Sequence, residues 1–320
     1  MNEREDIQAC ILALPEVAAW PEMAGIFEHS NSTPHSDWSL PGMACRAVGG
    51  DEAAAIPGAA ALACVQISII LVDDMLDDDP RGEHLRLGAG PAANLALAWQ
   101  AAAFRLVEQA PVSVERRSAV VASLAGMALT TALGQQWDAQ NLAGEENYWK
   151  VVRAKSTPFY AAALHVGALL GGAEAGVAEG LRDFGVLIGE VIQIQDDLLD
   201  AFQTPANPDW KQGRNNLLLL YALTAKHPTR DRFVELLSHI DDPQALHDAQ
   251  QILVRCGAVS YAAYQLIQRY QTARQRLAAL PLADPAPMQE LLTRQTQPLA
   301  DLLKTIGADV PEELLLQSRA

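Results

Sequence analysis

An apolar run over residues 53–72 leads directly into the most acidic stretch of the chain. Five of the seven residues at 73–79 are aspartates. In a helix, Asp73 and Asp77 lie one turn apart on the same face, so their like charges repel and destabilise the helix in isolation. We therefore expect a strongly apolar helix whose acidic end needs cations to offset this repulsion.

The spacing D-D-x-x-D occurs twice in the chain, each time at the end of an apolar helical run. The first copy is Asp73, Asp74 and Asp77, and the second is Asp196, Asp197 and Asp200. Hard divalent cations such as Mg²⁺ take oxygen ligands, usually one or two carboxylates each together with phosphate and water oxygens. A single short acidic run is more simply a solvated helix end. Two copies of one spacing favour a shared site in which Mg²⁺ holds a diphosphate.

The formal net charge of −16 limits the partners of the chain. Nucleic acids and anionic membrane surfaces are bound through basic patches, so we expect neither as a partner. The four cysteines form no C-x-x-C pair, which argues against a zinc site and a disulfide framework. The N-terminus is acidic and polar, unlike the basic start of a signal peptide. We expect reduced thiols and a cytoplasmic location.

Helical periodicity runs through the chain, without sustained β-branched alternation. Residues 53–72 form the one window long enough to span a bilayer, but Pro57, Gln66, Ser68 and the acidic exit favour a buried core helix over an integral membrane segment. Asp51 is expected to cap this helix. Further helices are predicted over residues 5–28 with breaks at Pro15 and Pro21, and over 91–109, 115–142, 145–170, 175–202, 213–226, 229–239, 243–255, 258–280 and 285–306.

The predicted fold class is therefore all-α. Half of the composition is apolar, enough for a large core, and no Gly/Ser- or Pro-rich linker divides the chain. We predict one domain over residues 1–320, a helical bundle with a central cavity.

The paired aspartate motifs resemble those of the trans-isoprenyl diphosphate synthase (polyprenyl synthetase) family, the class I isoprenoid synthases, from about Trp38 to about Ala222. The resemblance implies a homodimeric prenyltransferase that ionises an allylic prenyl diphosphate with Mg²⁺ and couples it to isopentenyl diphosphate, giving a C15–C20 or longer product. In the first motif the third metal ligand is Asp77 or, in the longer bacterial spacing, Asp79. In the second we expect Asp196 first and Asp200 next, with Asp197 one step round the helix.

The resemblance also implies roles for several polar residues. Lys155 and Ser156 stand where the family brings a Lys-Thr pair to the allylic diphosphate. Gln193 matches the glutamine of F-Q-x-x-D-D, and Arg214 replaces the lysine of a later D-x-x-x-G-K segment, keeping a cation near the leaving group. Gln135 matches a G-Q segment that lines the prenyl pocket, although such glutamines also cap interior polar groups.

The length of the prenyl product is expected to depend on the helix before the first motif. Ser68 and Ile69, five and four residues before Asp73, place no aromatic wall against the growing tail, so a C15 or longer tail should fit. Val65 and Cys64, one turn deeper, are of middling size and would limit the tail near C20.

The residues that would hold isopentenyl diphosphate match the family poorly. The family has a G-K-x-x-R-P segment, and here Arg46 keeps its arginine while Met43 replaces its lysine. Gln66 stands in place of a histidine, and Arg81 is the one arginine where a pair is expected. His84 would substitute as a cation, although an exposed loop histidine is the simpler interpretation.

This mismatch leaves three alternatives open. The first is transfer to another acceptor, such as a peptide tryptophan (ComQ-type prenylation) or a small aromatic compound, and the second is class I terpene cyclisation. The third is a noncatalytic partner subunit of a prenyl synthase, although such subunits generally lose their aspartates. A calcium-binding or purely structural role lacks support, because no EF-hand loop with its central glycine occurs.

Overall fold

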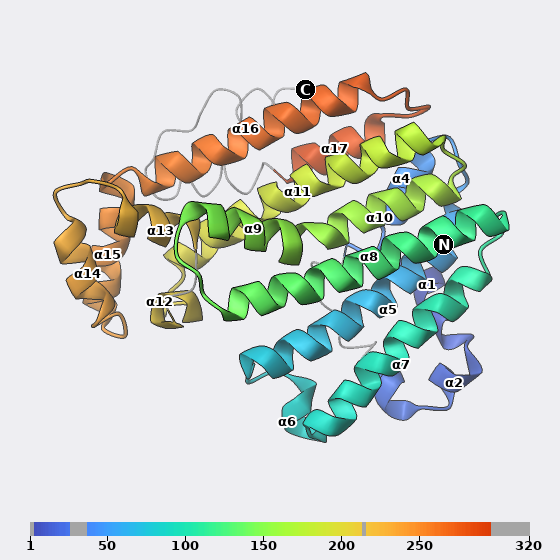
Figure 1. The fold of residues 1–320 in the computed structure, drawn as a ribbon, viewed down its shortest axis with the longest axis horizontal. Helices are drawn as coiled ribbons and strands as arrows, with labels where there is room; N and C mark the ends of the chain where they lie inside the picture. Colours follow the sequence, from blue (N-terminus) through green and yellow to red (C-terminus); the bar gives the residue numbers. More distant parts are fainter. Residues whose placement is uncertain (1–2, 26–36, 213–215, 296–320) are drawn as a thin grey trace. The chain divides into compact units, whose positions relative to one another are not determined.

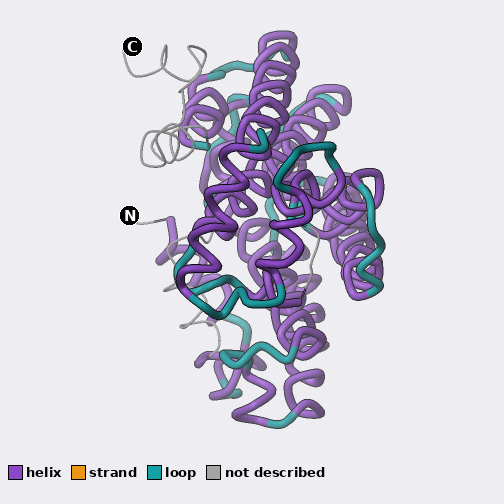
Figure 2. Tube along the Cα trace, turned by 90° about the vertical axis from the view of Figure 1, so that its left-hand side faces the viewer, coloured by secondary structure: helices purple, strands orange, loops and turns teal. Residues whose placement is uncertain are grey.

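The computed structural model describes residues 3–25, 37–212 and 216–295. Figure 2 shows helices and loops, and no strand, within these residues, so the predicted all-α class is confirmed. The helices are α1 (Glu3–Leu12), α2 (Pro15–Ala18), α4 (Leu40–Ala47), α5 (Glu52–Asp77), α6 (Glu83–Leu87), α7 (Ala89–Glu108), α8 (Val114–Ala139), α9 (Glu145–Lys155), α10 (Thr157–Leu170), α11 (Ala175–Phe202), α12 (Pro208–Gln212), α13 (Leu217–Thr224), α14 (Arg230–Leu237), α15 (Pro243–Arg255), α16 (Ala258–Ala279) and α17 (Ala286–Arg294).

The contacts among Cα atoms divide the chain into two compact units. Unit 1 comprises Met1–Ala132, Pro158–Val186 and Arg276–Met288, and unit 2 comprises Leu133–Thr157, Leu187–Gln275 and Gln289–Ala320. The divisions fall within helices α8, α10, α11, α16 and α17, so none of them coincides with a linker. The single domain and its central cavity stay predictions, and each unit is described by itself.

Helix α5 carries the first aspartate motif and begins and ends at positions that local chemistry explains. Asp51 caps its start, as predicted, because its carboxylate accepts a hydrogen bond from the amide of Ala53 at 3.1 Å. The helix ends at Asp77, and Asp78 adopts a left-handed conformation with φ 51°. The following residue precedes Pro80, where helical geometry is disfavoured. The motif therefore lies on the last turns of a helix.

Most of α5 is buried within unit 1. It packs along α7 and also contacts α1 and α4 (Figure 1), while Gly58 lets Val166 and Leu170 of α10 approach its backbone. Two helices among the described residues, α5 and α8, are long and apolar enough to cross a membrane, a test that buried core helices also pass. The most apolar window of α5 is 67% buried, as expected for a core helix. Helix α8 was not recognised in the sequence as a second such window.

Unit 2 has a core around α13, whose residues Leu217–Leu220 are all buried. Asn216 caps this helix, since its side-chain oxygen accepts from the amides of Leu218 and Leu219 at 3.0 and 3.4 Å. Helices α14 and α15 pack on α13 and on each other. A helix apolar on every side is stable in water only when it is covered in this way.

The structure differs from the predicted helices in a few places. The helix predicted over 145–170 is broken at Ser156 into α9 and α10, because Pro158 has no amide hydrogen for the helical bond and disfavours helix at Thr157. The short helices α4, α6 and α12 were not predicted from the sequence. The end of the helix predicted over 285–306 lies outside the described residues.

The crossing of α10 and α11 gives a test of the packing in unit 1. A Cβ at Gly185 would lie 2.5 Å from the carbonyl oxygen of Tyr160 and 2.8 Å from Cα of Ala161. Because these atoms are backbone, Gly185→Ala should lower the free energy of unfolding by about 1–3 kcal/mol. Gly126→Ala on α8, where a Cβ meets nothing within 4 Å, should be neutral or stabilising by about 0.5–1 kcal/mol. Urea denaturation at constant m-value measures both, and equal effects would contradict this account.

Candidate functional site

The first aspartate motif holds partly desolvated carboxylates at the tip of α5. Asp73, Asp74 and Asp77 are all half-buried. Burial, together with the charges of Asp79 and Asp73, raises the pKa of Asp74 to about 6. Repulsion at this end of α5 therefore acts on Asp74 from Asp79 and Asp73, whereas that expected between Asp73 and Asp77 stays a prediction, and a bound divalent cation would offset it.

Asp79 differs from these three because it is held by Arg81. It accepts from the backbone amide of Arg81 at 2.7 Å and from Nε and Nη2 of its guanidinium at 3.1 and 2.8 Å. These hydrogen bonds lower the pKa of Asp79 to about 2. The pairing favours Asp77 over Asp79 as the third carboxylate of the motif, and it engages the arginine predicted to bind substrate.

His84 is not the exposed loop residue that the sequence suggested. Only 9% of its side chain is exposed, and its Nε2 lies 3.5 Å from a carboxylate oxygen of Asp78. Helix α6 folds the ring back over Gly82, where a Cβ would lie 2.5 Å from Nδ1 of His84 and 2.9 Å from Cβ of Asp74. The exposed-loop interpretation is wrong because the turn after α5 brings α6 against its acidic end.

The second motif, at the end of α11, presents its carboxylates on two sides of the helix. Asp196 is exposed and Asp200 is half-buried. Burial first, and then the charge of Asp209, raises the pKa of Asp200 to about 6. Asp197 is buried, with 3% exposure. The accessible pair is thus the one expected from the sequence to bind metal first.

Asp197 is surrounded by hydrogen-bond donors of unit 2. The hydroxyl of Tyr148 and the amide of Leu217 donate to its Oδ2 at 2.6 and 2.8 Å, and Nε2 of Gln193 donates to its Oδ1 at 2.9 Å. These bonds lower the pKa of Asp197, but burial is the larger effect and raises it to about 7. A role as metal ligand stays a prediction for this residue.

Lys155 and Ser156 lie in the same unit, where α9 ends. The ammonium group of Lys155 pairs with Asp138 of α8 at 2.7 Å, and the hydroxyl of Ser156 donates to Oε1 of Gln193 at 2.5 Å. Helices α8 and α9 approach closely at this point only because residue 134 is a glycine. A Cβ at Gly134 would lie 2.5 Å from the backbone nitrogen of Lys155. Unit 2 thus links the predicted Lys155 and Ser156 to the helix of the second motif.

For two other predicted site residues, Gln135 and Arg214, the structure gives less information. Gln135 is 5% exposed on α8, so its role in lining a prenyl pocket stays a prediction. Arg214 lies outside the described residues.

The predicted second-substrate residues of unit 1 are paired with polar groups of the chain. Arg46 forms an ion pair with Glu52, and Glu3, whose pKa burial raises to about 7, lies near both charges. Gln66 accepts a hydrogen bond from the indole of Trp38 at 2.5 Å. Arg46 therefore lies near two acidic side chains, Glu52 and Glu3.

The two residues expected to leave room for the prenyl tail, Ser68 and Ile69, lie on different sides of α5. Ser68 is fully buried, and its hydroxyl donates to the carbonyl of Val65 at 2.9 Å. Ile69 is half-buried and lies one turn before Asp73, on the same side. The helix therefore directs Ile69 rather than Ser68 toward the side that carries the motif.

Both motifs supply the hard oxygen donors that Mg²⁺ prefers. Within residues 3–25, 37–212 and 216–295, no three His, Cys, Asp or Glu side chains form a metal-binding group by themselves. An Mg²⁺ ion typically takes one or two carboxylates and completes its shell with diphosphate and water oxygens. Asp73 belongs to unit 1 and Asp196 to unit 2, so their opposition across a cavity stays a prediction.

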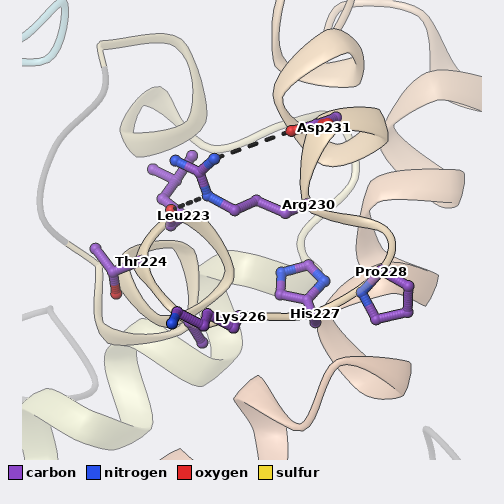
Figure 3. A pocket seen from close by; sticks show the side chains of 8 residues that line it. Leu223, Thr224, Lys226, His227, Pro228, Arg230 and Asp231 are labelled. Atoms are coloured by element: carbon purple, nitrogen blue, oxygen red, sulfur yellow. Dashed lines mark hydrogen bonds and ion pairs between the residues drawn. The ribbon is translucent and has the colours of Figure 1, made fainter.

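A pocket of about 770 Å³ lies between α13 and α14, and its polar side chains have a structural role (Figure 3). Arg230 donates from Nε to the carbonyl of Leu223 at 2.7 Å, and His227 donates from Nε2 to that of Ala222 at 2.8 Å. These side chains satisfy carbonyls at the end of α13, which has no further helical turn to do so. Neither aspartate motif lines this pocket.

Sequence reasoning missed two residues of this site. Tyr148 was not singled out, although a buried tyrosine needs a partner for its hydroxyl, and its partner Asp197 is distant in the sequence. Asn216 stands directly before four leucines, a recognisable helix-capping pattern that would have placed the start of α13.

Comparison with known proteins agrees with the paired motifs. The family model described as polyprenyl synthetase matches residues 40–256, more than half of the chain. The short chain isoprenyl diphosphate synthase of Methanothermobacter thermautotrophicus is 29% identical over 261 residues, which cover 77% of this chain and 80% of that protein. The nonaprenyl diphosphate synthase of Mycobacterium tuberculosis is 27% identical, with 72% of each chain covered.

Solved structures share the fold at low sequence identity. The geranylgeranyl pyrophosphate synthetase of Pyrococcus horikoshii superposes with a TM-score of 0.80 at 20% identity, covering 92% of this chain and 95% of that one. A polyprenyl synthase of Caulobacter crescentus, solved with calcium and isoprenyl diphosphate, gives 0.74 at 22% identity, covering 94% and 92%. The predicted class of enzyme, a prenyltransferase, is confirmed. The chain belongs to the polyprenyl synthetase family.

Proposed function

We propose that this protein lengthens prenyl diphosphates: it ionises an allylic prenyl diphosphate and couples the resulting cation to isopentenyl diphosphate. The observation that carries the proposal is the pair of D-D-x-x-D motifs, complete in a chain that belongs to the polyprenyl synthetase family. A noncatalytic subunit would not need both motifs. The proposed product is a C15–C20 or longer diphosphate.

Bound Mg²⁺ would neutralise the diphosphate and stabilise pyrophosphate as it leaves. The proposed ligands are Asp73, Asp74 and Asp77 in unit 1 and Asp196 and Asp200 in unit 2. Their half-buried or exposed positions suit direct contact with an ion. The raised pKa values of Asp74 and Asp200 mean that a cation at these carboxylates would also favour their ionised forms.

Three polar side chains of unit 2 would contact the allylic diphosphate. Lys155, only 22% exposed, is paired with Asp138 and would donate to the diphosphate as a fixed cation. Ser156 and Gln193, already hydrogen-bonded to each other, would orient one another toward it. These groups stabilise charge that develops on the leaving oxygen, which is the main catalytic requirement of such an ionisation.

A second candidate function, prenyl transfer to a different acceptor or cyclisation of the prenyl chain, is favoured by the surroundings of Arg46. Two carboxylates, Glu52 and Glu3, lie near its guanidinium, and Met43 and Gln66 stand where the family has cations. A second diphosphate would have to displace Glu52 to reach Arg46. An uncharged or cationic acceptor would meet no such opposition.

The proposed location of the protein is the cytoplasm, and its proposed assembly is a homodimer. The four cysteines are free thiols. Leu97, Phe104 and Leu129, on α7 and α8 of unit 1, are 67%, 43% and 75% exposed. A second subunit that covered these three side chains would remove apolar surface from water.

Loss of either motif should remove turnover without unfolding the protein. Asp73→Ala or Asp196→Ala should lower kcat for an allylic diphosphate with Mg²⁺ roughly a hundredfold or more, because each removes charge stabilisation of the leaving group. Circular dichroism should stay unchanged, since removing a repelling charge does not destabilise the helix. Asp78→Asn, exposed beside the first motif and compatible with left-handed backbone, should keep activity. Equal activity in all three variants would refute the assignment.

The identity of the acceptor is tested with farnesyl diphosphate and Mg²⁺, with and without isopentenyl diphosphate. The proposed function predicts an extended diphosphate only when isopentenyl diphosphate is present, and the second candidate predicts hydrocarbon or alcohol without it. Arg46→Ala should then raise KM for isopentenyl diphosphate roughly tenfold, as loss of a charge-assisted hydrogen bond implies. An unchanged KM would favour the second candidate.

The tail should run along the side of α5 that carries Ile69. Ile69→Phe should shorten the longest product, because the larger ring fills the space one turn from Asp73. Ser68→Phe, at a fully buried site, should instead lower the free energy of unfolding by about 1–3 kcal/mol through overpacking. Chromatography of dephosphorylated products and urea denaturation distinguish the two, and shortening by Ser68→Phe alone would contradict this assignment.

A further inference from the structure

Asp197 lies on the buried side of the helix turn that carries the second motif. It is 3% exposed, whereas its neighbour Asp196 is exposed. The D-D pair therefore consists of one residue that solvent reaches and one that it does not. Asp196 can therefore contact a metal ion in solution directly, whereas Asp197 faces groups of the protein.

Both carboxylate oxygens of Asp197 already accept hydrogen bonds from the protein. Oδ2 accepts from the hydroxyl of Tyr148 at 2.6 Å and from the amide of Leu217 at 2.8 Å, and Oδ1 accepts from Gln193 at 2.9 Å. An ionised carboxylate has about four acceptor positions. The backbone amide of Leu217 cannot rotate away, so little of the carboxylate remains for a metal ion.

The donors to Asp197 come from separate helices of unit 2. Tyr148 belongs to α9, Gln193 to α11, and Leu217 is the first residue of α13. The side chain of Asn216 adds a bond to the main-chain oxygen of Asp197 at 2.8 Å. A carboxylate at the start of α13 also interacts favourably with the positive end of that helix. Asp197 thus connects three helices at one buried point.

The same network reaches Lys155. Tyr148 lies near the start of α9, and Ser156, which directly follows Lys155, donates to Oε1 of Gln193 at 2.5 Å. Helix α9 is therefore bound near both ends, directly to Asp197 at Tyr148 and through Gln193 at Ser156. A change at Asp197 would shift the helix that presents the lysine.

We propose that Asp197 is a positioning residue, with Tyr148 as its principal partner, that holds Lys155 in register with Asp196 and Asp200 and does not itself ligate the metal. This inference rests on the proposed function and replaces the ligand role that the D-D-x-x-D spacing predicted for Asp197. Residues that orient ligands and catalytic groups in this way typically contribute roughly ten- to hundredfold to activity.

The first experiment separates folding from metal binding and needs no prenyl substrate. The thermal unfolding midpoint is measured in metal-free protein and again with Mg²⁺ and inorganic pyrophosphate. Asp197→Asn should lower the metal-free midpoint by several degrees and keep the rise that Mg²⁺ and pyrophosphate cause. Asp196→Asn, the matched control one residue away, should keep the metal-free midpoint and lose the rise. Loss of the rise in Asp197→Asn would overturn the proposal.

The second experiment uses Tyr148→Phe, which removes one hydroxyl and remains informative even where Asp197→Asn does not fold. We expect kcat to fall roughly tenfold while KM for the allylic diphosphate and the half-saturating Mg²⁺ concentration stay the same. Tyr264→Phe, at an exposed tyrosine of α16, should change none of these. An unchanged kcat in Tyr148→Phe would overturn the proposal. Absence of turnover in the unaltered protein would count against the proposed function alone, because the two midpoints need no substrate.

Discussion

The desolvation of carboxylates at the ends of apolar helices is the constraint on which the rest of this structure depends. Burial is the largest cause of the raised pKa of Asp74, Asp197 and Asp200. The fold thus holds these acidic groups in partly or fully buried positions, where their ionised forms are less stable than in water. Such an arrangement opposes stability and is typical of functional sites. A divalent cation would reverse the penalty at Asp74 and Asp200, which links the folding of these helices to the chemistry proposed for them.

Each unit offsets some of its acidic groups with donors of its own. Unit 2 surrounds Asp197 with donors from Tyr148, Gln193 and the start of α13. Unit 1 pairs carboxylates with arginines, Asp79 with Arg81 and Glu52 with Arg46. An arginine that already balances a carboxylate is less available to a second anion. The same holds for Lys155 of the proposed allylic half, which is paired with Asp138, so each half of the proposed site has a cation that already balances a carboxylate of the chain.

Membership of the polyprenyl synthetase family sets the class of chemistry but leaves the substrate choice to individual side chains. Relatives of similar identity are named as short-chain and as nonaprenyl diphosphate synthases, so similarity alone does not set the product. In this chain the determining positions would be Ile69, on the motif side of α5, and the surroundings of Arg46. Both are local differences within a shared fold.

The sequence by itself determined the all-α class, the Asp51 cap, the two aspartate motifs and the family, because helical periodicity, capping and motif spacing are local properties. Only the tertiary structure decided that Asp197 is buried beside Tyr148, that His84 folds under the end of α5, and that Arg46 and Arg81 pair with carboxylates of the chain. The physical reason is that burial and hydrogen bonding depend on which helices pack together. The contact of Asp197 with Tyr148 joins residues far apart in the sequence. The pairs of Arg46, Arg81 and His84 are between near neighbours, but they depend on how the chain turns after α4 and α5, which helical periodicity does not specify.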